Sequence, residues 1–151
     1  MSCVEAVLRG EVPYDVFTAR GHRNITARNA RTLEITKDPY VTKRGDCIVA
    51  CCSEKAAGEL RSEVREALGR KGEVVVIIDA GLFFDYVLAN TPGTTPTSKW
   101  RIVVRKSAYV DDSTVAILSR KAAADLDRRL VRELRSGVPV RIVVGVCPTR
   151  I

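Results

Sequence analysis

Residues 46–60 read DCIVACCSEKAAGEL, and the stretch recurs at 112–126 as DSTVAILSRKAAADL, at a constant offset of 66 and with eight identical positions. Leu68 with Leu134, and Val74 with Val140, extend the match at the same offset. Self-similarity of this kind indicates one supersecondary unit that is used twice. We therefore predict an internal duplication within a single domain of 151 residues, with units of about 31–79 and 101–146 and an approximate twofold relation between the halves.

Each unit is predicted to contain two strands, a helix and a third strand, from the period of its apolar residues. The predicted strands are 31–37, 46–52 and 73–79 in the first unit and 101–106, 113–118 and 138–146 in the second. The predicted helices are 54–69 and 120–136, with Ser53 and Ser119 as N-caps and Gly72 and Gly137 near the stops. A strand at 14–19 and one or two strands within 81–91 complete the expectation.

The fold class expected from these elements is α+β. The first two strands of each unit are too close in sequence for a helical crossover, which predicts that they pair antiparallel. We expect a mostly antiparallel sheet, sandwich-like or barrel-like, with two helices packed against it. The helices should bury one apolar stripe each, comprising Ala56, Ala57, Leu60, Val64, Ala67 and Leu68, and Ala122, Ala123, Leu126, Leu130 and Leu134.

Composition favours a soluble, cytoplasmic protein with no membrane partner. The chain is 46% hydrophobic and 28% charged, no apolar run approaches the ~18 residues of a spanning helix, and its start lacks the order of a signal peptide. The formal charge is +7, with seven basic and three acidic residues at 14–44, four and none at 99–106, and six and three at 120–135. Such an excess is typical of phosphate-facing surfaces, although many basic domains bind no nucleic acid.

Five cysteines are an odd number and give no disulfide framework. A bridge between Cys3 and Cys147 is conceivable, since some thermophile proteins have intracellular disulfides, but two free thiols are favoured. Cys51 and Cys52 correspond to Ile117 and Leu118 in the second unit, which indicates core packing. Cys47 corresponds to the polar Ser113 and its role stays open. The spacing lacks paired C-x-x-C units, so no metal site is expected.

Lys55 and Lys121 fall in the first turns of the two predicted helices, where a cation opposes the helix dipole. They could clamp an anion together, but Glu59 and Asp125 lie four residues further on, and local ion pairs are favoured. Trp100 lies between Lys99 and Arg101 and could stack on a base. Partial burial at the start of a strand is the favoured interpretation.

His22 is the only histidine and lies between Arg20 and Arg23 in a glycine-containing turn. It could act as an acid or base with Glu34 or Asp46, or it could be an incidental surface residue. Thr32, Glu34 and Thr36 alternate along one predicted strand and share a face. That face could be the solvated side of a half-buried sheet, or a cleft where His22, Glu34, Asp46 and Arg105 converge.

The strings GHRNI, TLEITK, TKRGDCIV and VVRKS, followed by the second SRKAA, resemble an archaeal family described as domain of unknown function 371. The resemblance covers about Tyr14 to Val146. It implies a compact intracellular protein and assigns no reaction. The family's polar residues fall here on Gly21, His22, Asn24, Ile25, Thr32, Glu34, Thr36, Thr42, Arg44, Gly45, Asp46, Cys47, Arg105, Lys106 and Ser107. The resemblance also implies a second histidine before the Thr-x-Glu strand. Residues 27–30 (ARNA) contain none, which argues against a two-histidine metal site.

Three functions follow as expectations. The favoured one is binding of nucleic acid or a phosphorylated ligand, with phosphate contacts from Arg20, Arg23, Arg44, Arg105 and Lys106. Asn24, Thr32, Thr36 and Ser107 complete the predicted ligand-binding set. The alternative is a small hydrolase or nuclease that uses His22 with Glu34 or Asp46, with Arg105 steadying an anion. The third is a structural or assembly protein, which could form a homo-oligomer. The sequence identifies no cofactor.

Overall fold

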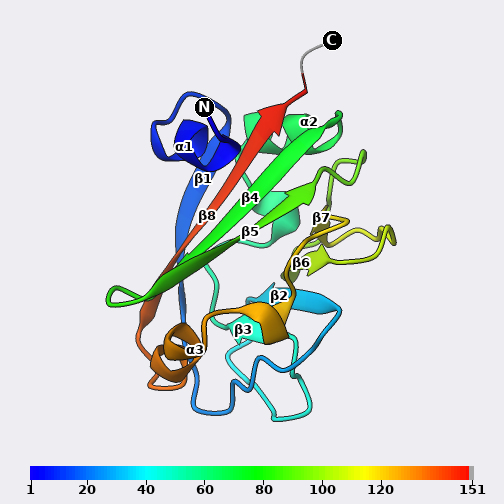
Figure 1. Cartoon of the computed structure of the whole chain (residues 1–151). Coiled ribbons are helices and arrows are strands. Elements are labelled where there is room, and N and C mark those ends of the chain that lie inside the picture. The colour runs from blue at the N-terminus through cyan, green and yellow to red at the C-terminus, as the bar shows by residue number, and fades with distance from the viewer. Residues whose placement is uncertain (150–151) are drawn as a thin grey trace.

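The computed structural model describes residues 1–149, in which eight strands and three α-helices form an α+β fold, as predicted (Figure 1). The elements in chain order are α1 (Cys3–Leu8), β1 (Tyr14–Arg20), β2 (Thr32–Thr36), β3 (Ile48–Ala50), α2 (Ser62–Leu68), β4 (Gly72–Asp79), β5 (Phe84–Asn90), β6 (Arg101–Arg105), β7 (Thr114–Ala116), α3 (Arg128–Leu134) and β8 (Pro139–Pro148). Short 3-10 turns at Ala57–Glu59 and Ala123–Asp125 precede α2 and α3. Nearly every predicted strand is therefore present.

The strands form two open four-stranded sheets. The larger sheet has the order β1-β8-β4-β5 and is antiparallel throughout. The smaller sheet has the order β3-β2-β6-β7, and only its central β2–β6 pair is antiparallel. β3 lies parallel to β2, and β7 lies parallel to β6, so the antiparallel pairing predicted within each unit is wrong. The loops 37–47 and 106–113 carry the chain back along the sheet without a helix, a crossover that the sequence analysis did not consider.

One continuous core joins both sheets and the two later helices. Leu33 and Ile35 of β2 are fully buried, as are Ile102 of β6 and Ile142 of β8. On β2 these apolar residues alternate with Thr32 and Glu34, which are only partly buried. Because successive side chains of a strand point to opposite faces, the smaller sheet has one face in the core and a second face that is mostly polar and only partly buried.

The two predicted helices are shorter than expected. Leu60 and Leu126 adopt extended backbone conformations, with ψ of 156° and 149°, and separate each 3-10 turn from the α-helix that follows. The apolar residues of both predicted stripes are nevertheless buried. The predicted N-caps are wrong, because Ser53 and Ser119 instead donate through Oγ to the carbonyl oxygens two residues later, at 2.7 and 2.6 Å. Within residues 1–149, no helix is long and apolar enough to cross a bilayer.

The two lysines that follow these serines form long-range ion pairs. Lys55 Nζ lies 2.7 Å from the carboxylate of Asp15, and Lys121 Nζ lies 2.8 Å from that of Asp85. The predicted local pairs are therefore wrong. The carboxylates of Glu59 and Asp125 instead bind Lys37 and Lys106, each at 2.8 Å.

The same contacts thus occur at matching places in the two halves. Exchanging β1 with β5, β2 with β6, β3 with β7 and β4 with β8 also leaves the strand order of both sheets unchanged. These observations agree with the predicted duplication. The duplication itself, and the twofold superposition that it implies, stay predictions.

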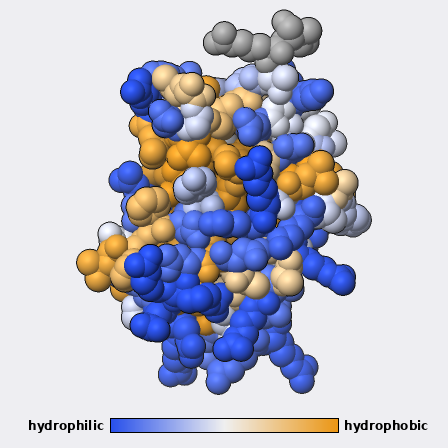
Figure 2. Space-filling view, in the orientation of Figure 1, coloured by the Kyte–Doolittle hydropathy of each residue, from blue (hydrophilic) through white to orange (hydrophobic). Residues whose placement is uncertain are grey.

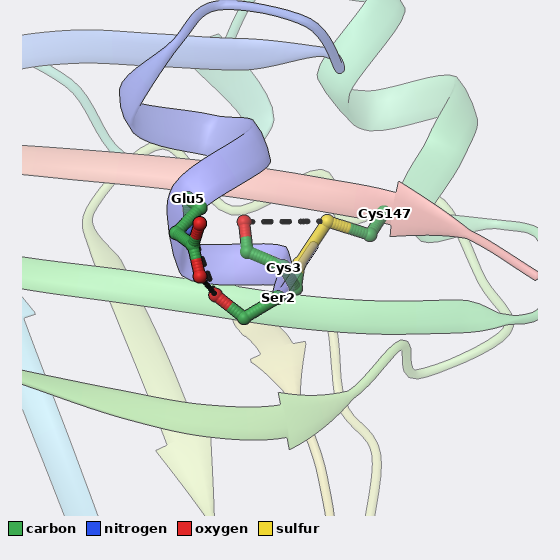
Figure 3. Close-up of a disulfide and its surroundings, with 4 residues drawn as sticks. All are labelled: Ser2, Cys3, Glu5 and Cys147. Atoms are coloured by element: carbon green, nitrogen blue, oxygen red, sulfur yellow. Dashed lines mark hydrogen bonds between the residues drawn. A yellow bond between two sulfur atoms is a disulfide. The ribbon is translucent and has the colours of Figure 1, made fainter.

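The N-terminal helix α1 was not predicted, and a disulfide fastens it to the last strand (Figure 3). Cys3 bonds to Cys147 across 144 residues of chain, so the favoured expectation of two free thiols is wrong. Ser2 caps the helix by accepting from the backbone N–H of Glu5 at 3.2 Å. Val7 packs on Gly145 of β8, where an added Cβ would come within 2.4 Å of the valine side chain. α1 thereby covers part of the outer face of the larger sheet.

Part of the remaining outer face is apolar and exposed to solvent. Leu8, Phe84 and Tyr86 are exposed, and with Ile77 and Val143 they line a shallow cavity of about 360 Å³. Figure 2 shows the hydrophobic area in the middle of this view, between α1 and β5. The predicted homo-oligomer stays a prediction.

Two residues assigned to the core on sequence grounds lie at the surface. Cys51 is buried as predicted, but Cys52 is exposed. Cys52 has φ of 55°, and its counterpart Leu118 has φ of 52° and is 51% exposed. The left-handed backbone at Cys52 and at Leu118 interrupts the alternation just after each strand, and both side chains are exposed, which period-based assignment cannot anticipate. Trp100 is 70% exposed, so its predicted partial burial is also wrong.

Candidate functional site

The polar face of the smaller sheet carries a chain of ionised groups. The register of β2 with β6 places Thr32 opposite Arg105, Glu34 opposite Val103 and Thr36 opposite Arg101. Arg101 donates to Glu34 at 3.2 Å and lies 3.6 Å from Asp111. Arg105 donates to Asp111 at 2.9 Å. Both arginines on this face therefore already have carboxylate partners.

Burial and hydrogen bonding set the ionisation of the two acids in opposite directions. Burial raises the pKa of Glu34, although Arg101 opposes the shift. Burial alone would also raise the pKa of Asp111, but hydrogen bonds from Ser113 and Thr114, with the charge of Arg105, lower it to about 2. Arg105 also donates to Thr114 and stacks on Tyr109, with its guanidinium carbon 4.9 Å from the ring centre. Arg105 is thus engaged on every side by the protein itself.

Cys47 lies beside Glu34, with its sulfur 3.9 Å from the carboxylate. Burial raises the pKa of this thiol, and the negative charge of Glu34 raises it further. The nucleophilic form of cysteine is the thiolate, which is favoured by nearby cations and disfavoured by burial. Cys47 is therefore a poor candidate for a catalytic nucleophile.

The three predicted catalytic residues are held by separate partners. His22 accepts through Nδ1 from the backbone N–H of Asn24 at 3.0 Å. Glu34 binds Arg101, and the carboxylate of Asp46 accepts from Asn29 at 3.1 Å. In the part of the chain that the structure describes, no hydrogen bond joins His22 to either carboxylate, and no three His, Cys, Asp or Glu residues are placed to hold a metal ion. The hydrolase hypothesis stays a prediction without a supporting contact.

The other predicted ligand-binding residues mostly make internal contacts. Thr32 donates to Asn29, and buried Thr36 accepts from the N–H of Asp38. Asn24 donates to the carbonyl of Val41 at 2.9 Å. Lys106 pairs with Asp125, while Ser107 accepts from the N–H of Tyr109. Most of these side chains stabilise loops, and Lys106 has its own carboxylate partner.

A second region collects cations that have no such partners. It consists of the loop 20–31, the loop 37–47 and α3 with Arg135, and we call it the basic end. Its exposed basic side chains that make neither an ion pair nor a side-chain hydrogen bond among residues 1–149 are Arg23, Arg28, Arg31, Lys43, Arg44, Arg132 and Arg135. Figure 2 shows that this lower end of the molecule is strongly hydrophilic.

The loop 20–31 holds the basic end together. Arg20 donates to the carbonyl of Gly137, just after α3, and Arg128 of α3 donates to the carbonyls of Thr26 and Ala27. On the other side, the backbone N–H groups of Arg28 and Asn29 both donate to the carbonyl of Asp46. These contacts fix the loop between α3 and the loop 37–47, so the cations of all three segments lie on one connected surface.

Close packing at Gly21 explains part of this geometry. A Cβ at Gly21 would lie 1.9 Å from the carbonyl oxygen of Leu134, and the N–H of Gly21 donates to Val138 at 2.8 Å. Only glycine lets the loop approach the end of α3 so closely. The glycine of the GHRNI string is thereby accounted for by packing.

Sequence reasoning found only part of the basic end. It selected Arg20, Arg23 and Arg44, and missed Arg28, Arg31, Lys43, Arg132 and Arg135. The charge counts at 14–44 and 120–135 contained the signal. What they could not show was that these two stretches, a hundred residues apart, meet in the fold.

Comparison with known proteins places the chain in a family. Residues 17–147 match the family described as Domain of unknown function (DUF371), and the chain belongs to that family. It is similar to an uncharacterized protein of Methanocaldococcus jannaschii, with 31% identity over 126 residues that cover 81% of this chain and 91% of the relative. The matched region contains nearly all of both sheets, both later helices and the basic end, whereas α1 lies before it.

Proposed function

We propose that this protein binds nucleic acid through the basic end. The observation that carries the proposal is the group of seven exposed basic side chains with neither an ion pair nor a side-chain hydrogen bond, drawn from three segments onto one surface. A surface of that kind attracts a polyanion because binding releases the counterions that the phosphates had condensed. A nucleic-acid partner also implies a location inside the cell, and we propose that the protein is cytoplasmic.

Contrast with the smaller sheet supports this choice of surface. Arg101 and Arg105 lie within 3.6 Å of carboxylates, so a phosphate would have to displace an existing partner. Arg23, Lys43 and Arg132 need give up only water. Because the cost of removing an ion-pair partner opposes binding, the unpaired cations are the stronger phosphate contacts.

Salt dependence tests the proposal. Fluorescence anisotropy with an end-labelled oligonucleotide would be measured at several salt concentrations between about 50 and 200 mM. We expect the logarithm of the association constant to fall linearly with the logarithm of salt concentration. With seven available cations the slope should be no steeper than about −5 on a single strand. Absence of binding at the lowest salt concentration would contradict the proposal.

A further inference from the structure

Trp100 is the only tryptophan of the chain, and it is 70% exposed at the start of β6. Tyr40, in the loop 37–47, is 82% exposed. Large aromatic side chains usually contribute to cores, because each can bury 150–250 Å² of largely apolar surface. Two that remain in solvent beside a basic surface therefore need an explanation.

The backbone places both rings along the approach to the basic end. The carbonyl of Trp100 accepts from the N–H of Lys37 at 2.9 Å, so Trp100 lies where the loop 37–47 begins. Tyr40 follows three residues later, at most about 10 Å further along the chain. The same loop then passes Val41, which Asn24 binds, and reaches Asp46, which the loop 20–31 binds. It thus connects Trp100 and Tyr40 with the cations of the basic end.

Four other aromatic rings of the protein already have a cationic partner. Tyr109 is the fourth residue of the loop 106–113, as Tyr40 is of the loop 37–47. The guanidinium carbon of Arg105 lies 4.9 Å from the centre of the Tyr109 ring. Cationic groups also lie over three further rings: Arg61 over Tyr14, Arg129 over Phe83 and Lys121 over Tyr86. Within residues 1–149, neither Trp100 nor Tyr40 has such a partner, and both side chains are largely exposed. Phe84 is also exposed without a cationic partner, but it lies on the larger sheet.

We propose that the ligand of the basic end is a single strand, whose bases stack on Trp100 and Tyr40 while its phosphates contact Lys43, Arg44 and the loop 20–31. This inference rests on the proposed function. Bases in a duplex are already stacked on each other and cannot reach a side-chain ring, whereas the bases of a single strand can. Exposed aromatic rings beside a basic track are the pattern of single-strand binding, and RNA and DNA share the chemistry that it needs.

The single tryptophan makes the test direct. Its intrinsic fluorescence would be recorded during titration with a single-stranded oligonucleotide of about 12 nucleotides, within the usual site size, as RNA and as DNA. A duplex of the same length serves as the comparison. We expect quenching by the single strands and no quenching by the duplex, because only a stacked base contacts the indole.

Substitutions separate stacking from charge. Trp100→Ala should weaken single-strand binding about tenfold in anisotropy, and Trp100→Phe should restore most of the loss. Phe84→Ala is the matched control, since Phe84 is similarly exposed, at 64%, but lies on the larger sheet. It should leave the affinity unchanged. A thermal melt of each variant confirms folding, which an exposed side chain should not affect.

The outcomes distinguish this inference from the proposed function. Quenching together with a loss specific to Trp100→Ala supports it. Salt-dependent binding without quenching, with Trp100→Ala unchanged, overturns the stacking proposal and leaves the proposed function standing. Tighter binding to the duplex than to the single strand also overturns it. Absence of binding to either form contradicts the proposed function, and this inference with it.

Discussion

The helices α2 and α3 have the same length and surroundings but opposite surface charge. Each has seven residues, follows a 3-10 turn and leads into one of the two central strands of the larger sheet. Val64 and Leu68 of α2 are buried, as are Leu130 and Leu134 at the same places in α3. The outward positions that hold Glu63 and Glu66 in α2 hold Arg129 and Arg132 in α3. Folding fixes the buried residues and leaves the exposed ones free to differ.

The neighbouring loops follow the same division. The loop 20–31, beside α3, has four basic residues and no acidic one, whereas the loop 91–100, which is bonded to α2 through Arg65 and Pro96, has Lys99 alone. The loop 106–113 contains two aspartates and one lysine. In Figure 1 α2 and α3 lie at opposite ends of the molecule. The α3 end is therefore basic and the α2 end is not, although both are built alike. Changes made at the α2 end can serve as controls for the same changes at the α3 end.

The largest effect is expected from removing the disulfide at the α2 end. This change should lower stability and leave binding unchanged. The disulfide Cys3–Cys147 lies there, since Cys147 pairs with Glu73 at the start of β4. Cys3→Ser combined with Cys147→Ser should lower the free energy of unfolding by about 4 kcal/mol, because the bridge closes a loop of nearly the whole chain. Urea denaturation would measure it, with the exposed Cys52→Ser as control. Oligonucleotide affinity at 25 °C should stay the same; a loss would mean that the two ends are not independent.

Neutralising the basic end should have the largest effect on binding. The triple variant Arg23→Gln, Lys43→Gln, Arg132→Gln removes one cation from each of its three segments. We expect about a hundredfold weaker binding at low salt and a shallower salt slope. The control, Arg9→Gln, Arg70→Gln, Lys71→Gln, makes the same change in charge outside the basic end. If both triple variants lose affinity equally, net charge rather than a defined surface explains the binding.

Exchanging single charges between the two helices sharpens the comparison. Arg132→Glu puts the α2 charge at its matching place on α3, and Glu66→Arg does the reverse. We expect the first to weaken binding about tenfold and the second to leave it within about twofold. Both side chains are exposed, so neither melting temperature should change much. Anisotropy measures the affinities, and an equal gain from Glu66→Arg would break the distinction between the ends.

The smallest expected effect is on the pH dependence of stability, and it concerns Asp111, the carboxylate that pairs with Arg101 and Arg105. The pKa of Asp111 is lowered to about 2 in the folded protein, from an ordinary value of 3.8. Its contribution to stability is therefore complete above pH 4 and is lost as the pH falls towards 2. Because Asp111 is partly exposed, we expect about 1 kcal/mol, seen as a difference between wild type and Asp111→Asn that is present at pH 7 and vanishes near pH 2.

Glu34 acts in the opposite direction and does not cancel this difference. Its raised pKa means that the folded protein binds the proton more tightly, so its contribution falls as the pH rises through the acid range. The contribution of Glu34 is present in both wild type and Asp111→Asn, so it cancels when the two free energies of unfolding are subtracted. A difference that stays constant from pH 7 to pH 2 would contradict the role given to Asp111.

Much of the fold could be predicted from the sequence because strands alternate visibly. The alternation of Leu33 and Ile35 with threonines and a glutamate predicted β2. Glycines after each helix indicated roughly where the helices end. The helix bounds failed because a 3-10 turn and an extended leucine reproduce the three- to four-residue spacing of a helix. The predicted ion-pair partners of Lys55 and Lys121 were wrong because the observed partners lie 40 and 36 residues away in the sequence.

The site was less predictable for a related reason. Charge runs at 14–44 and 120–135 indicated where cations are, but not which of them meet carboxylates. Arg105 was selected as a phosphate contact, yet Asp111 and Tyr109 occupy its guanidinium group. Whether an arginine is available depends on tertiary contacts, which the local sequence does not encode. Trp100 was predicted to be partly buried for the same reason, since only the fold shows that it is exposed.

The most direct test of the account is to map the bound surface residue by residue. Backbone amide signals would be followed by ¹H–¹⁵N NMR while an oligonucleotide is added at low salt. The account predicts shifts in the loops 20–31 and 37–47, in α3 and at Trp100, with α2 and the outer face of the larger sheet unchanged. Shifts centred on Arg105 and Asp111, or on α2, would contradict it.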